Sequence, residues 1–511
     1  MVIVLNFGGQ FAHLIARRVR DLGVRSEILP CDASLAHIKT LDPSGIILSG
    51  SPASVLEKGS PRMERGIFSL GIPILGICYG HQLMAHMLGG RVSPGKKKEY
   101  GREDLKIILG NELFHGFTGA KQSVWFSHGD QVIKLPGGFA KIASTAGCPI
   151  AGMANAKRRL FAIQFHPELT HTAIGEKVLS NFLFRICRAE KDWKLGAMLR
   201  KLEISLKREV GKNHVMIGIS GGVDSLVAAT LLHRAVGSRL HAAFVDTGLL
   251  RKNEVEDVTL SLKKQGFKNL HVVSAKNIFL RRLAGVADPE KKRKIIGHTF
   301  VEVFQRTVKQ ELKRYPVTFL AQGTIYPDRI ESAATSKYAA KIKSHHNLTL
   351  PKSLRLSILE PLKEFYKDEV RKIGTLLGLP KELVWRHPFP GPGLAIRIVG
   401  EITAERLRIL READAIFTEE LRASGEYGKI WQAFAVLLPL RTVGVMGDAR
   451  TYEYMIALRA VDSVDGMSAD WHKMPPELLE RISTRIVGEV RGVNRVLYDV
   501  TQKPPATIEY E

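Results

Sequence analysis

Short apolar runs alternate with amphipathic helical patterns along the first three quarters of the chain, and this alternation restricts the fold more than any other feature. One series fills residues 1–187, and a second begins at 195, after the polar stretch RAEKDWK. Such alternation is typical of parallel sheets with helices on both faces. Near HPFPGPG (387–393), prolines and glycines interrupt regular structure, and a mixed pattern follows. We therefore expect two doubly wound parallel-sheet α/β domains, 1–187 and 195–386, followed by an α+β domain over 387–511.

Length and composition restrict the class of protein further. A chain of 511 residues exceeds the usual single domain. The opening MVIVLNFGGQ lacks the basic and small-residue regions of a signal peptide, and no apolar run is long enough for a bilayer, so we expect a cytoplasmic protein with no membrane partner.

The net charge is +24, but Lys and Arg are spread along the chain. That spread favours a surface that attracts anionic small molecules over one that binds nucleic acid. The four cysteines form no C-x-x-C pair and suggest neither a zinc site nor a disulfide framework.

The stretch ILGICYGHQ places Cys78 directly after an apolar run, on a G-x-C-x-G turn before a helix. This is the arrangement of a nucleophile elbow with sulfur in place of oxygen, and a helix N-terminus lowers the pKa of a thiol. FAIQFHPELTHT offers His166 as a base and Glu168 as the group that orients the imidazole. The combination favours a catalytic thiol over an inert core cysteine. Without such a context, we expect surface or structural positions for His13, His86 and His128.

LGICYGHQLMAHMLGG, SHGDQV and QFHPELTHT resemble the hallmark stretches of class I glutamine amidotransferases. The resemblance covers residues 1–187 and implies hydrolysis of glutamine through a thioester on Cys78, with release of ammonia. It also implies an oxyanion hole made by the backbone amides of Ser51 and Tyr79. The family usually reads S-G-G-P, whereas this chain reads S-G-S-P from Ser49. A side chain at residue 51 disfavours backbone angles that glycine allows, so we expect the serine to affect the efficiency of glutamine hydrolysis.

A second chemical site is indicated by IGISGGVDSLVAA (217–229), which reads as a strand, a tight turn and a helix start. It lacks the lysine with which a Walker-type loop holds a γ-phosphate. Backbone amides and two hydroxyls there can form a nest for pyrophosphate, to which the helix adds its positive end. The carboxylate of Asp224 is well placed to hold Mg²⁺ against the phosphates.

The hexapeptide SGGVDS resembles the S-G-G-x-D-S motif of the ATP-pyrophosphatase superfamily. The resemblance implies that ATP is cleaved between its α- and β-phosphates, which leaves an adenylated substrate. The ATP-binding residues it implies are those of the motif and the aspartate that ends AAFVD: Ser220, Gly221, Gly222, Val223, Asp224, Ser225 and Asp246.

Seven further stretches resemble the glutamine-hydrolysing GMP synthetase family: GVADPEKKRKIIG, LAQGTIYPDRIES, IKSHHN, FYKDEVR, RHPFPGPGLAIR, GDARTYEY and KPPATIEYE. With the amidotransferase part, the similarity extends over essentially the whole chain. It implies that ATP adenylates the C2 oxygen of xanthosine monophosphate (XMP) and that ammonia displaces AMP to give GMP. Glutamine, XMP and ATP are then the substrates, and Mg²⁺ is the cofactor. Residues 398–511 resemble the family's dimerisation domain, so we expect a homodimer.

The same resemblance implies several site residues. Arg293, Lys503 and Glu509 match positions that hold XMP. Lys367 matches a cation on the ATP side, and Asp368 a second metal ligand beside Asp224. Two acids of a catalytic lid are matched by Asp328 and Glu331. A surface salt bridge is the alternative for each isolated charge.

The family typically reads H-H-N-V-G-G-L-P, whereas this chain has HHNLTLP at 345–351. Glycine gives a mobile segment its conformational freedom, so the loss of two glycines predicts a lid whose closure limits turnover. The alternative is that neighbouring residues have become the hinge.

Two other functions remain open from the residues alone. Another adenylating amidotransferase, such as an NAD synthetase or a nucleoside-modifying enzyme, would share the S-G-G-x-D-S loop but not HPFPGPGL together with KPPATIE. A nucleotide- or RNA-binding regulator would account for the charge, but the chain has no RNP-like aromatic motif and carries two sets of catalytic residues. We therefore expect a carbon–nitrogen ligase that uses glutamine as its amide donor.

Overall fold

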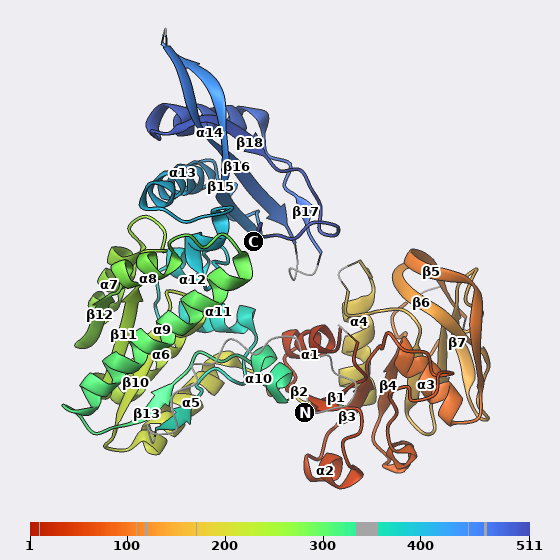
Figure 1. The fold of residues 1–511 in the computed structure, drawn as a ribbon. Coiled ribbons are helices and arrows are strands. Elements are labelled where there is room, and N and C mark those ends of the chain that lie inside the picture. Colours follow the sequence, from red (N-terminus) through yellow and green to blue (C-terminus); the bar gives the residue numbers. More distant parts are fainter. Residues whose placement is uncertain are drawn as a thin grey trace. The chain divides into compact units, whose positions relative to one another are not determined.

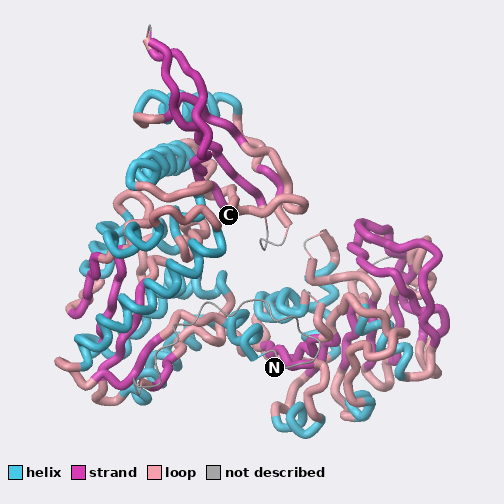
Figure 2. Tube along the Cα trace, in the orientation of Figure 1, coloured by secondary structure: helices cyan, strands magenta, loops and turns pink. Residues whose placement is uncertain are grey.

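The computed structural model describes residues 1–9, 11–108, 110–117, 121–169, 171–333, 356–447, 449–463 and 468–511. The described residues form two compact units, one within 1–198 and 327–345 and the other within 199–326 and 346–511 (Figures 1 and 2). The altered segment at 345–351 lies outside the described residues, so the expectation of a slow lid remains a prediction. In the described part of the chain, no helix is both long and apolar enough to cross a membrane.

A sheet of nine strands forms the centre of the first unit, in the order β2-β1-β3-β4-β9-β8-β7-β5-β6. Its first five strands are parallel, as the alternating pattern predicts, whereas β8, β7, β5 and β6 join them in antiparallel pairs that the pattern did not reveal. The parallel strands β3 and β4 are buried throughout, which explains why they read as unbroken apolar runs. The strands are β1 (Val2–Asn6), β2 (Ser26–Pro30), β3 (Gly45–Leu48), β4 (Ile74–Ile77), β5 (Arg91–Ile107), β6 (Gln122–Lys134), β7 (Ala140–Ser144), β8 (Gly152–Asn155) and β9 (Leu160–Ile163).

Helices pack against this sheet through apolar faces. The first of them buries Ile15, Ala16 and Val19, which lie on one side at helical spacing. The helical segments are α1 (Ala12–Asp21), α2 (Leu35–Thr40), η1 (Arg65–Ser69), α3 (Tyr79–Met87), α4 (Gly175–Ser180) and η2 (Asn181–Ile186). The polar stretch after them is anchored rather than free, because Trp193 is buried, donates its amide hydrogen to Gly23 O at 2.9 Å and lies 4.2 Å beneath the guanidinium of Arg20.

The second unit contains the predicted parallel sheet of five strands, in the order β12-β11-β10-β13-β14. The runs VMIGI, LHAAFVD, LHVVSA and VTFLAQG supply its first four strands, and the short β14 was not anticipated. The strands are β10 (His214–Ile219), β11 (Leu240–Asp246), β12 (Asn269–Ser274), β13 (Val317–Ala321) and β14 (Ser357–Leu359). The accompanying helices are α5 (Leu195–Val210), α6 (Val223–Val236), η3 (Gly237–Arg239), α7 (Glu254–Lys264), α8 (Lys276–Leu283), α9 (Pro289–Leu312), α11 (Lys367–Leu376) and α12 (Lys381–Val384). The helix α10 (Tyr326–Ala333) belongs to the first unit except for Tyr326.

The C-terminal part of this unit is α+β, as predicted. A long antiparallel hairpin pairs with one short antiparallel strand and one parallel strand. The side chain of Thr403 accepts a hydrogen bond from the amide of Arg406 at 3.1 Å, which starts the long helix after the HPFPGPG break. The elements are η4 (Gly393–Arg397), α13 (Ala404–Ala423), β15 (Gln432–Met446), β16 (Ala449–Asp462), β17 (Asp470–Trp471), α14 (Pro476–Glu489) and β18 (Val493–Tyr498).

One apolar core joins the two sheets of the second unit. It includes Leu249 and Phe279 from the parallel-sheet part and Phe417 and Ile456 from the α+β part. Gly393 fits this close packing, because it has a φ of +65° and a Cβ there would lie 2.3 Å from Leu249 O. The HPFPGPG stretch therefore breaks regular structure without separating the hydrophobic cores on either side of it.

Candidate active sites

Cys78 lies at a sharp turn between β4 and α3 and is only 5% exposed. Its φ of 54° and ψ of −103° are rare for a residue with a side chain. The flanking glycines permit this turn. A Cβ on Gly76 would approach Gly80 O to 2.6 Å, and a Cβ on Gly80 would approach Leu48 O to 2.5 Å. The G-x-C-x-G spacing thus reflects close backbone packing that places the thiol at the N-terminus of a helix.

His166 and Glu168 follow β9, and both are buried. The imidazole Nδ1 lies 2.7 Å from Oε1 of Glu168. The thiol and the imidazole meet beside Gly50, whose Cβ position would lie 3.4 Å from Cε1 of His166 and 3.9 Å from Cβ of Cys78. Burial opposes a charge on the imidazole, but Glu168 and the hydrogen-bonded Cys78 together raise the pKa of His166 above its ordinary value. This environment favours an imidazolium at His166 beside the thiol of Cys78.

Three residues that the sequence did not indicate hold this pair in place. The amide of His166 donates to Trp125 O at 3.0 Å, in β6. The hydroxyl of Thr172 donates to His166 O at 2.6 Å and accepts from the amide of Trp125 at 3.1 Å. Arg18 Nε, in α1, donates to Glu168 O at 3.0 Å. Apart from the bond between Thr172 and His166, these contacts join residues far apart in the chain, which a local motif does not reveal.

The backbone strain that we expected at Ser51 is absent. Ser51 is not among the described non-glycine residues with positive φ, and its hydroxyl accepts a hydrogen bond from the amide of Ala53 at 3.2 Å. Glycine is required instead at residue 9, because a Cβ on Gly9 would lie 2.3 Å from Gly50 O. Ser51 also lines a pocket of about 210 Å³ between the loops that follow β1 and β3, with Phe7 among the other lining residues.

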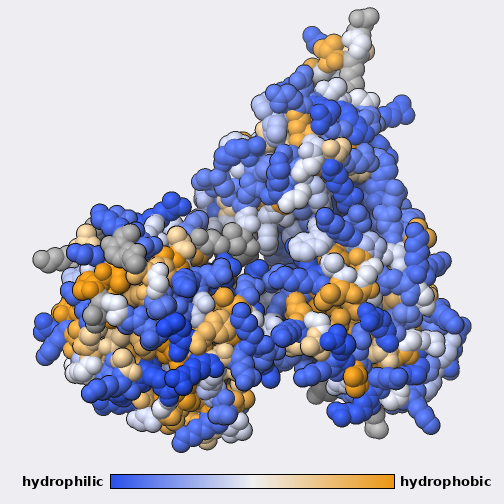
Figure 3. Space-filling view, turned by 180° about the vertical axis from the view of Figure 1, so that it is seen from behind, coloured by the Kyte–Doolittle hydropathy of each residue, from blue (hydrophilic) through white to orange (hydrophobic). Residues whose placement is uncertain are grey.

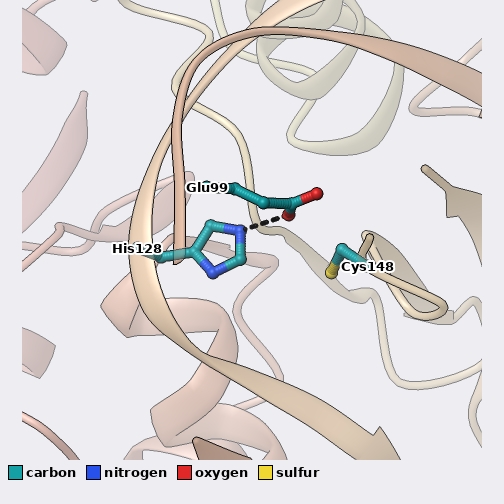
Figure 4. A group of neighbouring side chains, drawn as sticks. All are labelled: Glu99, His128 and Cys148. Carbon is teal, nitrogen blue, oxygen red and sulfur yellow. Dashed lines mark ion pairs between the residues drawn. The ribbon is translucent and has the colours of Figure 1, made fainter. Parts of the chain in front are cut away.

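A second buried group consists of Glu99, His128 and Cys148 (Figure 4). It lies close enough to the thiol site for Cys78 to act electrostatically on Cys148. His128 Nε2 lies 2.9 Å from Glu99 Oε2, and His128 Nδ1 donates to Asp130 O at 2.9 Å. Burial first, and then the charges of Glu99 and Cys78, raise the pKa of Cys148 to about 12, so this thiol stays protonated at neutral pH. His128 is therefore a buried structural residue rather than a surface residue.

The loop from Ser220 to Ser225 connects β10 to α6, as predicted. Gly221 has a φ of +78°, and Gly222 caps the helix in an extended conformation. The two hydroxyls brace the loop itself, because Ser225 Oγ accepts from the amide of Ser220 at 3.2 Å and donates to Gly222 O at 2.9 Å. The amide of Gly222 donates to Ser220 Oγ at 3.2 Å. The serines thus give the loop its shape beside the helix N-terminus.

Asp224 and Lys367 are 143 residues apart in sequence, yet Asp224 Oδ2 lies 2.5 Å from Lys367 Nζ. The other oxygen, Oδ1, is buried without a hydrogen-bond partner, which suits a ligand of a hard cation. Asp368 follows Lys367 at the start of α11, and its carboxylate lies 3.9 Å from Lys372 Nζ. Arg371 adds a cation that interacts with both Asp224 and Asp368, although burial lowers its pKa.

Residues outside the motif also shape the phosphate loop. A Cβ on Gly323, after β13, would lie 3.1 Å from the amide nitrogen of Ser225. Arg386 pairs with Glu254 at 2.7 Å, and a Cβ on Gly221 would lie 3.5 Å from Arg386 Nη2. Both residues belong to quoted stretches, LAQG and RHPF, but only the structure shows that they contact the loop.

The carboxylate of Asp246, which ends β11, accepts a hydrogen bond from the amide of Gly248 at 2.8 Å. The turn after β11 thus uses Oδ1 of Asp246.

The C-terminal tail is held by ion pairs. Glu509 accepts from Arg397 Nη2 at 2.9 Å and from Gln432 Nε2 at 2.6 Å, and Glu511 pairs with the buried Lys292 in α9. The neighbouring Arg293 pairs with Glu290 of its own helix. The backbone of Lys503 pairs with that of Ala469. The tail therefore lies beside the helix that carries Arg293, and Glu509 already has two protein partners.

Three family models match successive parts of the chain: glutamine amidotransferase class-I at residues 3–186, NAD synthase at 198–287, and GMP synthase C terminal domain at 419–510. Relatives named "GMP synthase [glutamine-hydrolyzing]" match its full length. Those from Carboxydothermus hydrogenoformans, Oleidesulfovibrio alaskensis and Aquifex aeolicus are 55%, 53% and 52% identical. Each match covers 100% of this chain and 99% of the relative. The chain belongs to the glutamine-hydrolysing GMP synthase family.

Membership in the GMP synthase family decides between the alternatives that the residues left open. The NAD synthase model covers only the part around the phosphate loop, whereas the GMP synthase relatives account for both catalytic loops and the tail. ATP is a co-substrate in this family, and the class I amidotransferase and parallel-sheet folds are those that the sequence predicts.

The structure brings some of the predicted residues together. Cys78 lies beside His166, and Asp224 lies beside Lys367. The two lid acids lie outside this comparison. Asp328 belongs to the unit that does not contain the phosphate loop, and the side chain of Glu331 lies outside the described residues.

Proposed function

We propose that this chain hydrolyses glutamine at Cys78, adenylates XMP with ATP at the phosphate loop, and aminates the adenylate to give GMP, AMP and pyrophosphate. The observation that supports the proposal is the presence of two candidate sites in one member of the family: a buried Cys–His–Glu group and an S-G-G-x-D-S loop paired with a lysine. Because the substrates are nucleotides and glutamine, we also propose a cytoplasmic location. The domain division at 1–187, 195–386 and 387–511 is proposed with it.

In the glutaminase half, the Cys78 thiolate attacks the side-chain carbonyl carbon of glutamine. The backbone amides of Ser51 and Tyr79 are proposed to stabilise the oxyanion. His166 then gives its proton to the nitrogen as the C–N bond breaks, so ammonia leaves and a thioester remains. Water, deprotonated by the same imidazole, hydrolyses the thioester to glutamate. Glu168 holds the ring by the 2.7 Å contact and stabilises its positive charge.

In the synthetase half, the amides of Gly221 and Val223 at the N-terminus of α6 are proposed to hold the β- and γ-phosphates of ATP, with Ser220, Gly222 and Ser225 keeping the loop in shape. Lys367 supplies the cation that the loop itself lacks. The unpartnered oxygen of Asp224 fits a hard cation, so Asp224 and Asp368 would hold Mg²⁺. That ion would neutralise the charge of the departing pyrophosphate.

Asp246 is assigned to the nucleotide, and Arg293 and Lys503 to XMP. The partly exposed side chain of Arg293 on α9, next to the anchored tail, supports a phosphate contact there. Glu509 is also assigned to XMP. In addition, its ion pair with Arg397 holds the C-terminal tail in place. The lid acids Asp328 and Glu331 retain their assignment from the family motif.

The products of one mixture test this function. With ATP, Mg²⁺, glutamine and XMP, we expect GMP, AMP, pyrophosphate and glutamate in equal amounts. Omission of XMP should stop the release of pyrophosphate. Formation of ADP instead of AMP would contradict the proposal, because it requires cleavage between the β- and γ-phosphates. So would turnover of another acid acceptor in place of XMP.

We further propose that the β15–β16 hairpin forms a homodimer interface. Leu440, Val443, Val445 and Tyr452 are each at least 60% exposed on this hairpin. Figure 3 shows hydrophobic side chains towards its free end, within a mostly hydrophilic surface. Exposed apolar side chains grouped on one element are typical of an interface, and a two-fold axis would bring the same patch of each subunit together.

Replacing Val443 by glutamate is expected to convert the dimer to a monomer, because it places a charge in the apolar contact of both subunits. Light scattering after size-exclusion chromatography measures the mass. Ile204→Glu is the matched control, since Ile204 is 70% exposed on α5, outside the hairpin. A monomeric parent protein, or a Val443→Glu variant that stays dimeric at low concentration, would remove the hairpin from the interface.

A further inference from the structure

Three histidines lie on neighbouring strands of the five-stranded sheet, at the end opposite to the phosphate loop (Figure 1). His214 begins β10, and His241 and His271 lie near the start of β11 and β12. The register pairs Met216 with His241 and Ala243 with His271. Because side chains alternate along a strand, this register places all three imidazoles on the same face of the sheet.

Helix α9 covers that face and supplies a carboxylate. Phe304 and Val308 pack against Met216 and Ala243 in one apolar cluster. Glu311 follows at the spacing that continues their side of the helix. The apolar contact between helix and sheet therefore ends where the buried Glu311 meets the histidines.

The distances in this group suit a metal ion better than a hydrogen-bond network. Glu311 Oε2 lies 3.4 Å from His241 Nδ1 and 3.4 Å from His271 Nε2. All three atoms are within 4.8 Å of one another, and each is buried without a hydrogen-bond partner. A tetrahedral Zn²⁺ with ligands at about 2.0–2.1 Å separates them by about 3.3 Å. The two separations from Glu311 Oε2 match the edges of such a tetrahedron.

A second layer of contacts orients the ligands. His214 Nδ1 lies 2.9 Å from His241 Nε2. This contact fits the tautomer of His241 that carries its proton on Nε2. Nε2–H of His241 can then donate to His214, which leaves the Nδ1 lone pair directed at Glu311. Metal-binding histidines usually donate their other N–H in this way. The ring of Tyr315 packs 4.3 Å from His241.

We propose that His241 Nδ1, His271 Nε2 and Glu311 Oε2 form a Zn²⁺ site, with water as the fourth ligand. His271 is 27% exposed at its side chain and provides the open side from which the ion and the water enter. The bound ion ties the end of α9 to β11 and β12 and stabilises this end of the sheet. The cysteine-containing group in Figure 4 is a poorer candidate, because His128 and Glu99 already lie at the hydrogen-bonding distance of 2.9 Å.

Titration of the metal-depleted full-length chain with Zn²⁺ alone tests the proposal. We expect one ion per chain in the parent protein and loss of that binding in His271→Ala. His214→Ala should weaken binding by roughly 10- to 100-fold, as for other residues that orient a ligand. His298→Ala is the matched control, because His298 is exposed on the same helix and should leave binding unchanged.

Two further readouts separate this site from other zinc-binding groups and from misfolding. Bound Co²⁺ should show the visible bands of a four-coordinate ion without a thiolate charge-transfer band, which a site at Cys78 or Cys148 would give. In the presence of a chelator, His271→Ala and the parent should have the same midpoint temperature of thermal unfolding. Addition of Zn²⁺ should raise this midpoint temperature only for the parent. His271→Asn repeats the comparison if the alanine variant is unstable. Equal Zn²⁺ binding by the parent and the folded His271 variants would overturn the proposal, as would an absence of binding by the parent.

Discussion

Replacement of Cys78 by alanine is expected to abolish GMP formation with glutamine as the nitrogen source and to leave formation from ammonium salts close to the parent rate. The sulfur of Cys78 is the only atom that becomes acylated in the proposed mechanism. Its loss should reduce the glutamine-dependent rate by a factor on the order of 10⁴ or more. The phosphate loop belongs to the other unit of the molecule, so adenylation of XMP does not need this side chain.

Both nitrogen sources are to be measured with the same preparation, at an ammonium concentration and pH that saturate the parent enzyme with free ammonia. Cys31→Ala is a suitable control. Cys31 is equally buried in the same unit, and its pKa is raised to about 11 by burial and by Asp32, so it is an inert core thiol. An equal loss with glutamine and with ammonia in Cys78→Ala would show that Cys78 supports the fold rather than the glutaminase reaction.

The local geometry of both catalytic loops could be predicted from the sequence because it depends on adjacent residues. Around Cys78, the turn needs glycines two positions before and two positions after the thiol, and these appear directly in the chain. The same holds for the phosphate loop, where Gly221 has positive φ and the two serines brace the turn. A short motif therefore contains most of the information that fixes each loop.

Contacts between distant segments could not be predicted in this way. The resemblance to a family placed Lys367 on the ATP side, but its ion pair with Asp224 was not predicted, because no local pattern connects them. The two histidine ligands of the proposed zinc site and the orienting His214 lie on separate strands, and only the strand register puts them on one face. A search for cysteine spacing could not find a site without cysteine.

The sequence also left open whether the segments that interrupt regular structure separate domains. HPFPGPG contains the residues of a domain boundary, yet Gly393 packs against Leu249 O within a core that both sides share. RAEKDWK has the polarity of a linker, yet Trp193 is buried against the first unit. Polarity and proline content indicate where regular structure stops. They do not show whether the segment has a core to pack on.

Replacement of Asp224 by asparagine is expected to reduce XMP-dependent release of pyrophosphate by about 10²–10³-fold, the range found when one group that stabilises the transition state is removed. The amide has nearly the same shape, so the loop should keep its conformation. It lacks the negative charge that would hold Mg²⁺ and that pairs with Lys367 at 2.5 Å. Glutamate production without XMP should persist at the parent's basal rate, because it depends on Cys78 in the other unit.

Pyrophosphate and glutamate are measured in the same samples, so the two activities can be compared directly. Asp257→Asn controls for the loss of a carboxylate, because Asp257 is exposed on α7 and should change neither rate. Higher Mg²⁺ should restore part of the Asp224→Asn activity if the carboxylate acts as a metal ligand, whereas a purely structural aspartate would give no such rescue. Near-normal release of pyrophosphate by Asp224→Asn would exclude the carboxylate from the mechanism and leave Lys367 with the loop amides as the phosphate site.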